Sequence, residues 1–339
     1  MRLSYRARRV AAYGGGRLGV AGVVGIAGLA GVMWGEAKLA ERRIPAAKTA
    51  PPISHDTVWA APGVSATRPP IRIALMGDST AAGYGVHRDR DTPAAQLAIG
   101  ISDAARRPVH VTNVAVVGAE SQHLPAQYEA LGTARIELAI VMIGANDVTE
   151  LTKPGEAVPY LEELVRKLRN RGAEVIVGTC PDLGTIRPIA QPLRAYARRL
   201  SRHMAREQTV AVVRSGGRTV SLGDVLGPLF ASRLELFSAD RFHPSEEGYR
   251  EASLAILPSA LDALGLRTRA RSASVFTTRR SKPVEKAAAQ AVAHPGSEVA
   301  GSDARPVTAM HSDGTWARLR RRRPLRGAGR RIGIGRTPT

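Results

Sequence analysis

The residues best suited to chemistry begin with Ser79, in a stretch that reads Leu-Met-Gly-Asp-Ser-Thr-Ala-Ala-Gly-Tyr-Gly over 75–85. The apolar run 71–76 predicts a buried strand that ends at Gly77. A side chain just past such a strand lies at the carboxyl edge of a sheet, where α/β proteins bind their ligands. Ser79 is therefore a candidate nucleophile, provided that the chain supplies a base and donors for an oxyanion.

An aspartate and a histidine three residues apart supply the candidate base. Asp240 and His243 stand in a loop ahead of a predicted helix that Ser245 is expected to cap. At this spacing the carboxylate can reach the imidazole of the same turn and orient it, as general-base catalysis requires. Four other histidines lack an aspartate three residues upstream and are interpreted as structural or surface residues: His87, His110, His123 and His203.

Two further strand ends supply candidate oxyanion donors. The predicted strand 109–117 runs into Gly118, whose backbone N–H is accessible because glycine carries no side chain. The apolar strand 136–143 runs into Gly-Ala-Asn-Asp, which places the side-chain amide of Asn146 at the sheet edge. Taken alone, each is also an ordinary turn residue. Cys180 is the single cysteine, which excludes an intramolecular disulfide, and we expect it to pack at a strand end.

In this order, the four stretches resemble those of the SGNH (GDSL-like) hydrolases, a bacterial esterase and lipase family. Gly77-Asp78-Ser79 resembles the first motif block, 113–118 the second, 144–147 the third and 240–244 the fifth. Thr80 departs from the pattern, because it stands where the name-giving leucine would be. The resemblance covers about 71–265 and implies a flavodoxin-like three-layer α/β/α sandwich with a mostly parallel sheet. It also implies that no metal or cofactor is needed.

The resemblance further implies an acyl-transfer mechanism and a role for each residue. Ser79 would attack the carbonyl of an ester, His243 would take its proton, and Asp240 would orient His243. The N–H groups of Ser79 and Gly118 and the side chain of Asn146 would bind the oxyanion. Two alternatives stay open: an O-acyltransferase or deacetylase that acts on an envelope carbohydrate with the same residues, and a catalytically idle scaffold tethered to a membrane.

The segments that must position these residues alternate between strands and helices. Further strands are predicted at 173–178 and 209–213, and helices at 92–107, 158–171, 191–208 and 245–264. This alternation predicts a mostly parallel sheet with helices on both faces. Asp78 and Asp147 fall in the turns and are interpreted as hydrogen-bonding residues. The loops 84–91, 119–127 and 182–191 are expected to shape the acyl pocket.

The net charge of +20 is concentrated at the two ends of the 339-residue chain. Basic residues in 1–17 precede an uncharged, glycine-rich run over 18–35, which predicts a transmembrane anchor or an export signal. The catalytic domain would then lie outside the cytoplasm, anchored to the membrane, or secreted if the segment is cleaved. Residues 36–70 are predicted to be a proline-rich linker that carries a hydrolase domain over 71–266.

The last segment, 267–339, is predicted to be a disordered basic tail. It is rich in Ser, Thr, Pro, Gly and Arg, a composition that buries too little apolar surface to offset its chain entropy. Its arginines are expected to contact anionic lipid or polymer, if any partner at all. Nucleic acid is not expected, because no nucleic-acid-binding motif accompanies the arginines.

Overall fold

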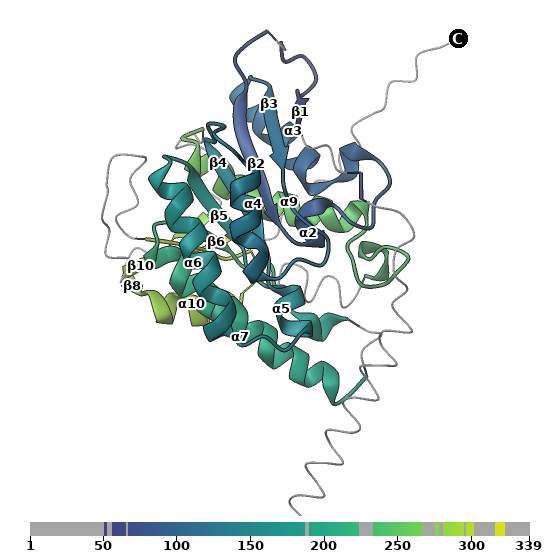
Figure 1. Ribbon diagram of the computed structural model, residues 1–339, viewed down its shortest axis with the longest axis vertical. Coiled ribbons are helices and arrows are strands. Elements are labelled where there is room, and N and C mark those ends of the chain that lie inside the picture. Colours follow the sequence, from purple (N-terminus) through teal and green to yellow (C-terminus); the bar gives the residue numbers. More distant parts are fainter. Residues whose placement is uncertain are drawn as a thin grey trace, which may run out of the picture.

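A ten-stranded sheet organises the protein in its computed structural model (Figure 1). The structure describes residues 51–52, 56–65, 67–186, 190–223, 233–266, 275–277, 281–294, 296–301 and 316–322. Five parallel strands form the centre of the sheet in the order β3-β2-β4-β5-β6. Their bounds are Ile71–Gly77 (β2), Val109–Asn113 (β3), Leu138–Met142 (β4), Glu174–Gly178 (β5) and Arg218–Val220 (β6). This is the flavodoxin-like order, in which the first parallel strand lies between the second and the third.

Helices cover both faces of the sheet, which confirms the predicted three layers (Figure 1). Side chains alternate along each strand, so Leu75 packs against α3 and α9, whereas Met76 packs in the cluster of α4 and α6. The helix bounds are Pro93–Ala105 (α3), Leu124–Ala130 (α4), Pro154–Asn170 (α6), Leu193–Arg214 (α7) and Glu246–Ala263 (α9). Short 3-10 helices lie at Asp89–Asp91, Ser121–His123, Leu183–Thr185 and Leu234–Leu236.

The predicted strand 209–213 is wrong, because these residues form part of the last turns of α7. A run with three valines resembles a buried strand, and short apolar runs do not distinguish strands from buried helices. Here the helix is buried on two sides. Val212 packs with the cluster around α6, while Val210 and Val213 pack against the C-terminal helix α10 (Val284–Val292).

The prediction of a disordered tail is also wrong for the described residues beyond 281. Strand β9 (Glu298–Gly301) pairs antiparallel with β6, and β10 (Trp316–Arg322) pairs antiparallel with β9. Val284, Ala287 and Ala291 form a buried helical face on α10. These small side chains gave a weak apolar signal, and their burial depends on valines of α7 far earlier in the sequence. The short strands β7 (Val275–Thr277) and β8 (Lys282–Pro283) both pair with β10.

Buried charges connect this extension to the rest of the sheet. Glu298 of β9 is fully buried, and its carboxylate lies 3.4 Å from the guanidinium of Arg218 on β6. Arg320 of β10 pairs with Asp262 of α9 at 2.6 Å. Because an unpaired buried charge is strongly unfavourable, these ion pairs favour a fixed position for the extension on the domain.

Part of the predicted linker is also structured. Strand β1 (Asp56–Trp59) pairs antiparallel with β3, so the linker prediction for 36–70 is wrong at these four residues. The expected membrane segment 18–35 lies outside the described residues. Among the helices that the structure describes, none is long and apolar enough to cross a bilayer.

Candidate active site

The turn after β2 presents Ser79 at the carboxyl edge of the sheet. Ser79 begins the one-turn helix α2 (Ser79–Ala82), and the carboxylate of Asp78 caps it by accepting the Thr80 N–H at 2.8 Å. Gly77 has a φ of +126°, a backbone conformation that residues other than glycine rarely adopt. The buried amide of Gln127 bonds both the N–H and the carbonyl of Gly77, at 2.7 and 2.8 Å. Both backbone groups of Gly77, two residues before the candidate nucleophile, are therefore fixed by hydrogen bonds to one side chain.

A continuous line of hydrogen bonds joins Ser79, His243 and Asp240. The Nε2 atom of His243 lies 3.0 Å from the Oγ of Ser79, and its Nδ1 lies 2.6 Å from a carboxylate oxygen of Asp240. An ionised carboxylate can only accept, so Nδ1 carries a proton and Nε2 is left as the acceptor for the serine hydroxyl. The structure thus brings together residues that are 164 positions apart in the chain.

Asp240 is held as an ionised carboxylate. Burial by itself would raise its pKa, but hydrogen bonds from His243, the Phe242 N–H and the Ser238 hydroxyl outweigh burial and hold the pKa well below its usual range. One oxygen accepts the three bonds from the Ser238 hydroxyl and the two backbone N–H groups, while the other faces Nδ1. Asp240 can therefore stabilise an imidazolium throughout the neutral pH range.

Backbone bonds and aromatic contacts fix the histidine loop. The N–H of Ser238 bonds the carbonyl of His243 at 2.8 Å, and Ser245 caps α9, as predicted, by accepting the Gly248 N–H. The ring of Tyr84 meets the imidazole edge-on, with 4.4 Å between centroids. These contacts leave the imidazole side chain only 14% exposed, aimed at Ser79.

The two other predicted donors lie beside the nucleophile turn. The N–H of Val116 bonds the carbonyl of Gly77 at 3.0 Å, which places the exposed Gly118 next to this turn. Asn146 belongs to α5 (Ala145–Thr149), and its amide donates one hydrogen to the carbonyl of Ala119 at 2.9 Å. A side-chain amide has two donor hydrogens, so one remains for a ligand.

Two buried residues that hold the site were missed in the sequence. Gln208 bonds the Cys180 N–H and the Ile143 carbonyl, which fixes the turn before Asn146. The Tyr249 hydroxyl donates to the Tyr84 carbonyl at 2.7 Å. Both residues lie on helices, and no local pattern distinguishes them from ordinary core residues.

The other titratable candidates lie away from Ser79 or act within turns, as predicted. Asp147 accepts the N–H and hydroxyl of Ser121. Cys180 is buried, and burial raises the pKa of its thiol, so it does not form a reactive thiolate. His87 and His203 are exposed, His123 accepts the Glu120 N–H, and His110 faces Asp56.

Burial of Asp78 predicts a pH-dependent loss of stability. Burial raises the pKa of its carboxyl from 3.8 to about 6. Well below pH 3.8 the group is neutral in both folded and unfolded chains, at pH 4 the difference between the two states is still small, and above pH 6 folding must bury a charge, which costs ~3 kcal/mol. Asp78→Asn keeps an N-cap acceptor. We expect this variant to unfold at a higher temperature than the unaltered protein at pH 8 and at a similar one at pH 4. An equal difference at both pH values would contradict this expectation.

The fold and the hydrogen-bonded Ser-His-Asp arrangement have the geometry of an α/β serine hydrolase. A model of the GDSL-like Lipase/Acylhydrolase family matches residues 75–251. A GDSL-like esterase of Mycobacterium tuberculosis is 41% identical over 239 residues, covering 68% of this chain and 76% of that protein. The chain therefore belongs to the GDSL-like lipase/acylhydrolase family, and it is an ester-hydrolysing enzyme, as the sequence predicted.

The chain is also similar to solved structures of low sequence identity. A variant of an acetyl-xylooligosaccharide esterase from Geobacillus stearothermophilus shares 17% identity, with a TM-score of 0.46, and covers 61% of this chain and 99% of its own. A lipolytic protein of the G-D-S-L family from Veillonella parvula shares 19% identity, with a TM-score of 0.46, and covers 56% of this chain and 97% of its own.

Proposed function

We propose that this protein is a serine esterase that hydrolyses acyl esters through a covalent acyl-enzyme on Ser79. The observation that carries the proposal is the hydrogen-bonded line from the Ser79 hydroxyl through both nitrogens of His243 to Asp240. This arrangement can remove a proton from the serine and return it to a leaving alcohol.

In the acylation step, Ser79 Oγ attacks the ester carbonyl carbon while His243 Nε2 takes the hydroxyl proton. The carbonyl π electrons move to its oxygen, and Asp240 stabilises the imidazolium that has formed. When the tetrahedral intermediate collapses, the alcohol leaves with the proton from His243. Water then attacks the acyl-enzyme, with His243 first as the base and then as the acid, which releases the carboxylic acid and restores Ser79.

The oxyanion would be bound by three donors from three strand ends. The N–H of Ser79 lies at the first turn of α2, where no earlier helical carbonyl can accept it. The Gly118 N–H and the second hydrogen of the Asn146 amide complete the set. Exposed side chains of Val116 and Val117 stand directly before Gly118, at 52% and 42% exposure, and offer apolar surface for an acyl chain.

Reaction with a fluorophosphonate probe tests this proposal directly. We expect the probe to label the purified chain at Ser79, as read by mass spectrometry of the labelled peptide. His243→Ala should abolish the labelling, because the serine then has no base. His87→Ala, which alters an exposed histidine outside the hydrogen-bonded line, is the matched control and should label normally. Absence of labelling in the folded, unaltered chain would refute the proposal.

Asn146 provides a graded test of the oxyanion site. Removing one donor typically lowers kcat by about 10²–10³-fold. Asn146→Ala should show this loss with short acyl esters, whereas KM should change little. Thr149→Ala lies on the same short helix, and we expect it to retain near-normal turnover. An Asn146→Ala variant with normal kcat would exclude the amide from the oxyanion site.

The N-terminal segment supports a location outside the cytoplasm. The basic residues in 1–17 and the uncharged run 18–35 favour an anchored or exported enzyme. Fractionation of cells that produce the full chain, with and without residues 1–35, would test this location. Recovery of the full chain in the cytosolic fraction would contradict it.

A further inference from the structure

The exposed face of α7 carries an array of basic side chains that catalysis does not use. Arg199, Arg202, His203 and Arg206 are all exposed and follow one another at helical spacing. Arg199 makes no ion pair within the part of the chain that the structure describes. The carboxylate of Glu207 is 3.9 Å from His203 and 4.0 Å from Arg206, at the outer limit for an ion pair.

These side chains line a groove between α7 and α10. The groove has a volume of about 450 Å³, which is within the usual range for sites of small molecules. Its lining is basic on the α7 side, but Leu200, Ala289 and Val292 supply apolar contacts. A ligand that fits both parts has an anionic group and an apolar portion beside it.

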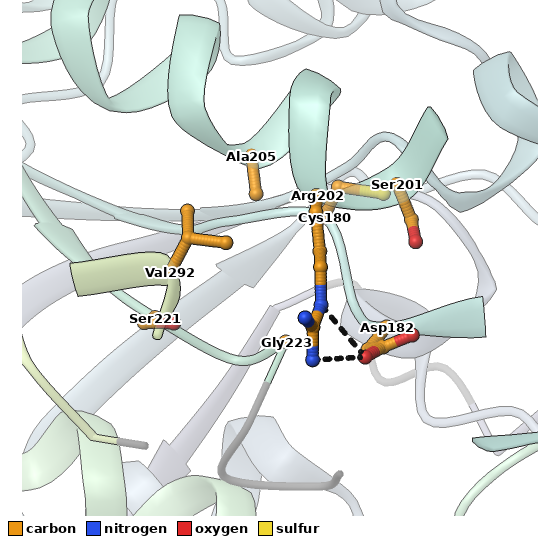
Figure 2. A pocket seen from close by; sticks show the side chains of 8 residues that line it. All are labelled: Cys180, Asp182, Ser201, Arg202, Ala205, Ser221, Gly223 and Val292. Atoms are coloured by element: carbon orange, nitrogen blue, oxygen red, sulfur yellow. Dashed lines mark hydrogen bonds and ion pairs between the residues drawn. The ribbon is translucent and has the colours of Figure 1, made fainter. Parts of the chain in front are cut away.

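Arg202 is held in a fixed orientation at one border of the groove. Figure 2 shows its side chain running from α7 to the carboxylate of Asp182, which lies 3.2 Å from both Nε and Nη2. Asp182 is buried at 4% exposure. Figure 2 draws a small pocket next to the groove, and Arg202 and Val292 line both. An arginine fixed in this way loses less conformational entropy when it binds an anion.

The groove and the catalytic residues share one apolar cluster. Leu200 and Val292, which line the groove, pack against a buried cluster that also includes Ala145 and Val148 of α5. Phe242 packs against the same cluster and immediately precedes His243. A surface bound in the groove would therefore be close to the edge of the sheet that carries Ser79.

We propose that the α7–α10 groove binds the phosphate group of an anionic phospholipid and thereby seats the enzyme on a membrane surface. Arg199 and Arg206 contact the phosphate, Arg202 borders it, and Leu200 and Val292 contact the glycerol and upper acyl region. The apolar lining favours a lipid over a free anion, and the array of four cationic or titratable groups favours an anionic headgroup over a zwitterionic one.

Vesicle binding by the full chain tests this proposal. Sedimentation would compare vesicles of phosphatidylcholine alone with vesicles that also contain phosphatidylglycerol. Each basic residue near an anionic surface contributes about 1 kcal/mol, so Arg199→Glu/Arg206→Glu should weaken binding to the anionic vesicles by at least about 30-fold. The control, Arg72→Glu/Arg135→Glu, changes the net charge equally at two exposed arginines elsewhere and should stay within about threefold.

All three proteins keep residues 1–35 and 267–339, so any binding by these segments is common to them. Equal weakening in the two double variants would overturn the proposal in favour of a general charge effect, and equal binding by all three would place lipid contact elsewhere.

A competition experiment with the unaltered protein on anionic vesicles is a second test. If inorganic phosphate displaces the protein from the vesicles at concentrations similar to those at which a soluble short-chain phosphatidylglycerol does, the groove is a free-anion site. Stronger displacement by an oligonucleotide would indicate a nucleic-acid site. Thermal unfolding checks that each variant is folded.

Discussion

Ser79→Ala is expected to lower kcat for short acyl esters by roughly 10⁵–10⁶-fold while the protein stays folded. In the proposed mechanism Ser79 Oγ is the atom that forms the acyl-enzyme, and no other described group at the site takes that place. The hydroxyl has one described partner, His243, and makes no contact that positions an element of the fold. Turnover of the purified variant, measured with the unaltered protein at the same pH, checks the prediction.

Thr80→Ala provides the matched control for Ser79→Ala. Thr80 lies in the same turn of α2, and its backbone N–H, which the Asp78 carboxylate accepts, is kept when the side chain is shortened. We expect this variant to retain activity within a few-fold. Ser79→Ala with near-normal turnover would show that ester hydrolysis proceeds at another group. An unfolded Ser79→Ala protein would instead be recognised by its circular dichroism, and Ser79→Cys would then repeat the test.

Gly77→Ala is expected to destabilise the protein by about 4 kcal/mol or more, a large fraction of the stability of an ordinary domain. A Cβ atom at this position would lie 1.9 Å from the carbonyl oxygen of Met142, which belongs to the neighbouring strand β4. The residue also has a φ of +126°. Neither the strand nor the turn can move without breaking the bond from the Asp78 N–H to the same carbonyl. Denaturant unfolding or soluble yield measures the effect.

Gly132→Ala measures the cost of a left-handed φ without a steric clash. Gly132 also has a positive φ, at +57°, but a Cβ atom there meets nothing within 4 Å. Backbone strain alone should therefore cost only about 1 kcal/mol. If Gly77→Ala proves as mild as Gly132→Ala, close packing of the nucleophile turn against β4 is not what requires a glycine.

The candidate site could be predicted from the sequence because each proposed catalytic residue follows a local signal. Ser79 comes two residues after the glycine that ends an apolar strand, and Asp240 is close enough to His243 to bond it within one loop. Parallel strands bring their carboxyl ends to one edge, so residues that follow different strands converge there. The sequence also determined the layers, because continuous apolar strands that alternate with helices are typical of a parallel sheet covered on both faces.

Contacts between distant segments were decided only by the tertiary structure. The valines at 210–213 were assigned to a strand because a helix that is buried on two sides shows a continuous apolar run rather than a stripe. Gln127 and Gln208 hold the turns of the candidate site by bonding their backbone N–H and carbonyl groups. Because every turn has such groups, the sequence does not indicate which of them a distant glutamine will bond.

The C-terminal extension shows the same division. By itself, the segment after 281 offers small and basic side chains that bury little surface. It folds because β6 presents a free strand edge and α7 presents Val210 and Val213 to α10. The sequence thus determined the residues that we propose carry the chemistry and the sheet that brings them together. The tertiary structure decided that β9 and β10 extend that sheet beyond β6, because their pairing depends on surfaces that form only after the rest has folded.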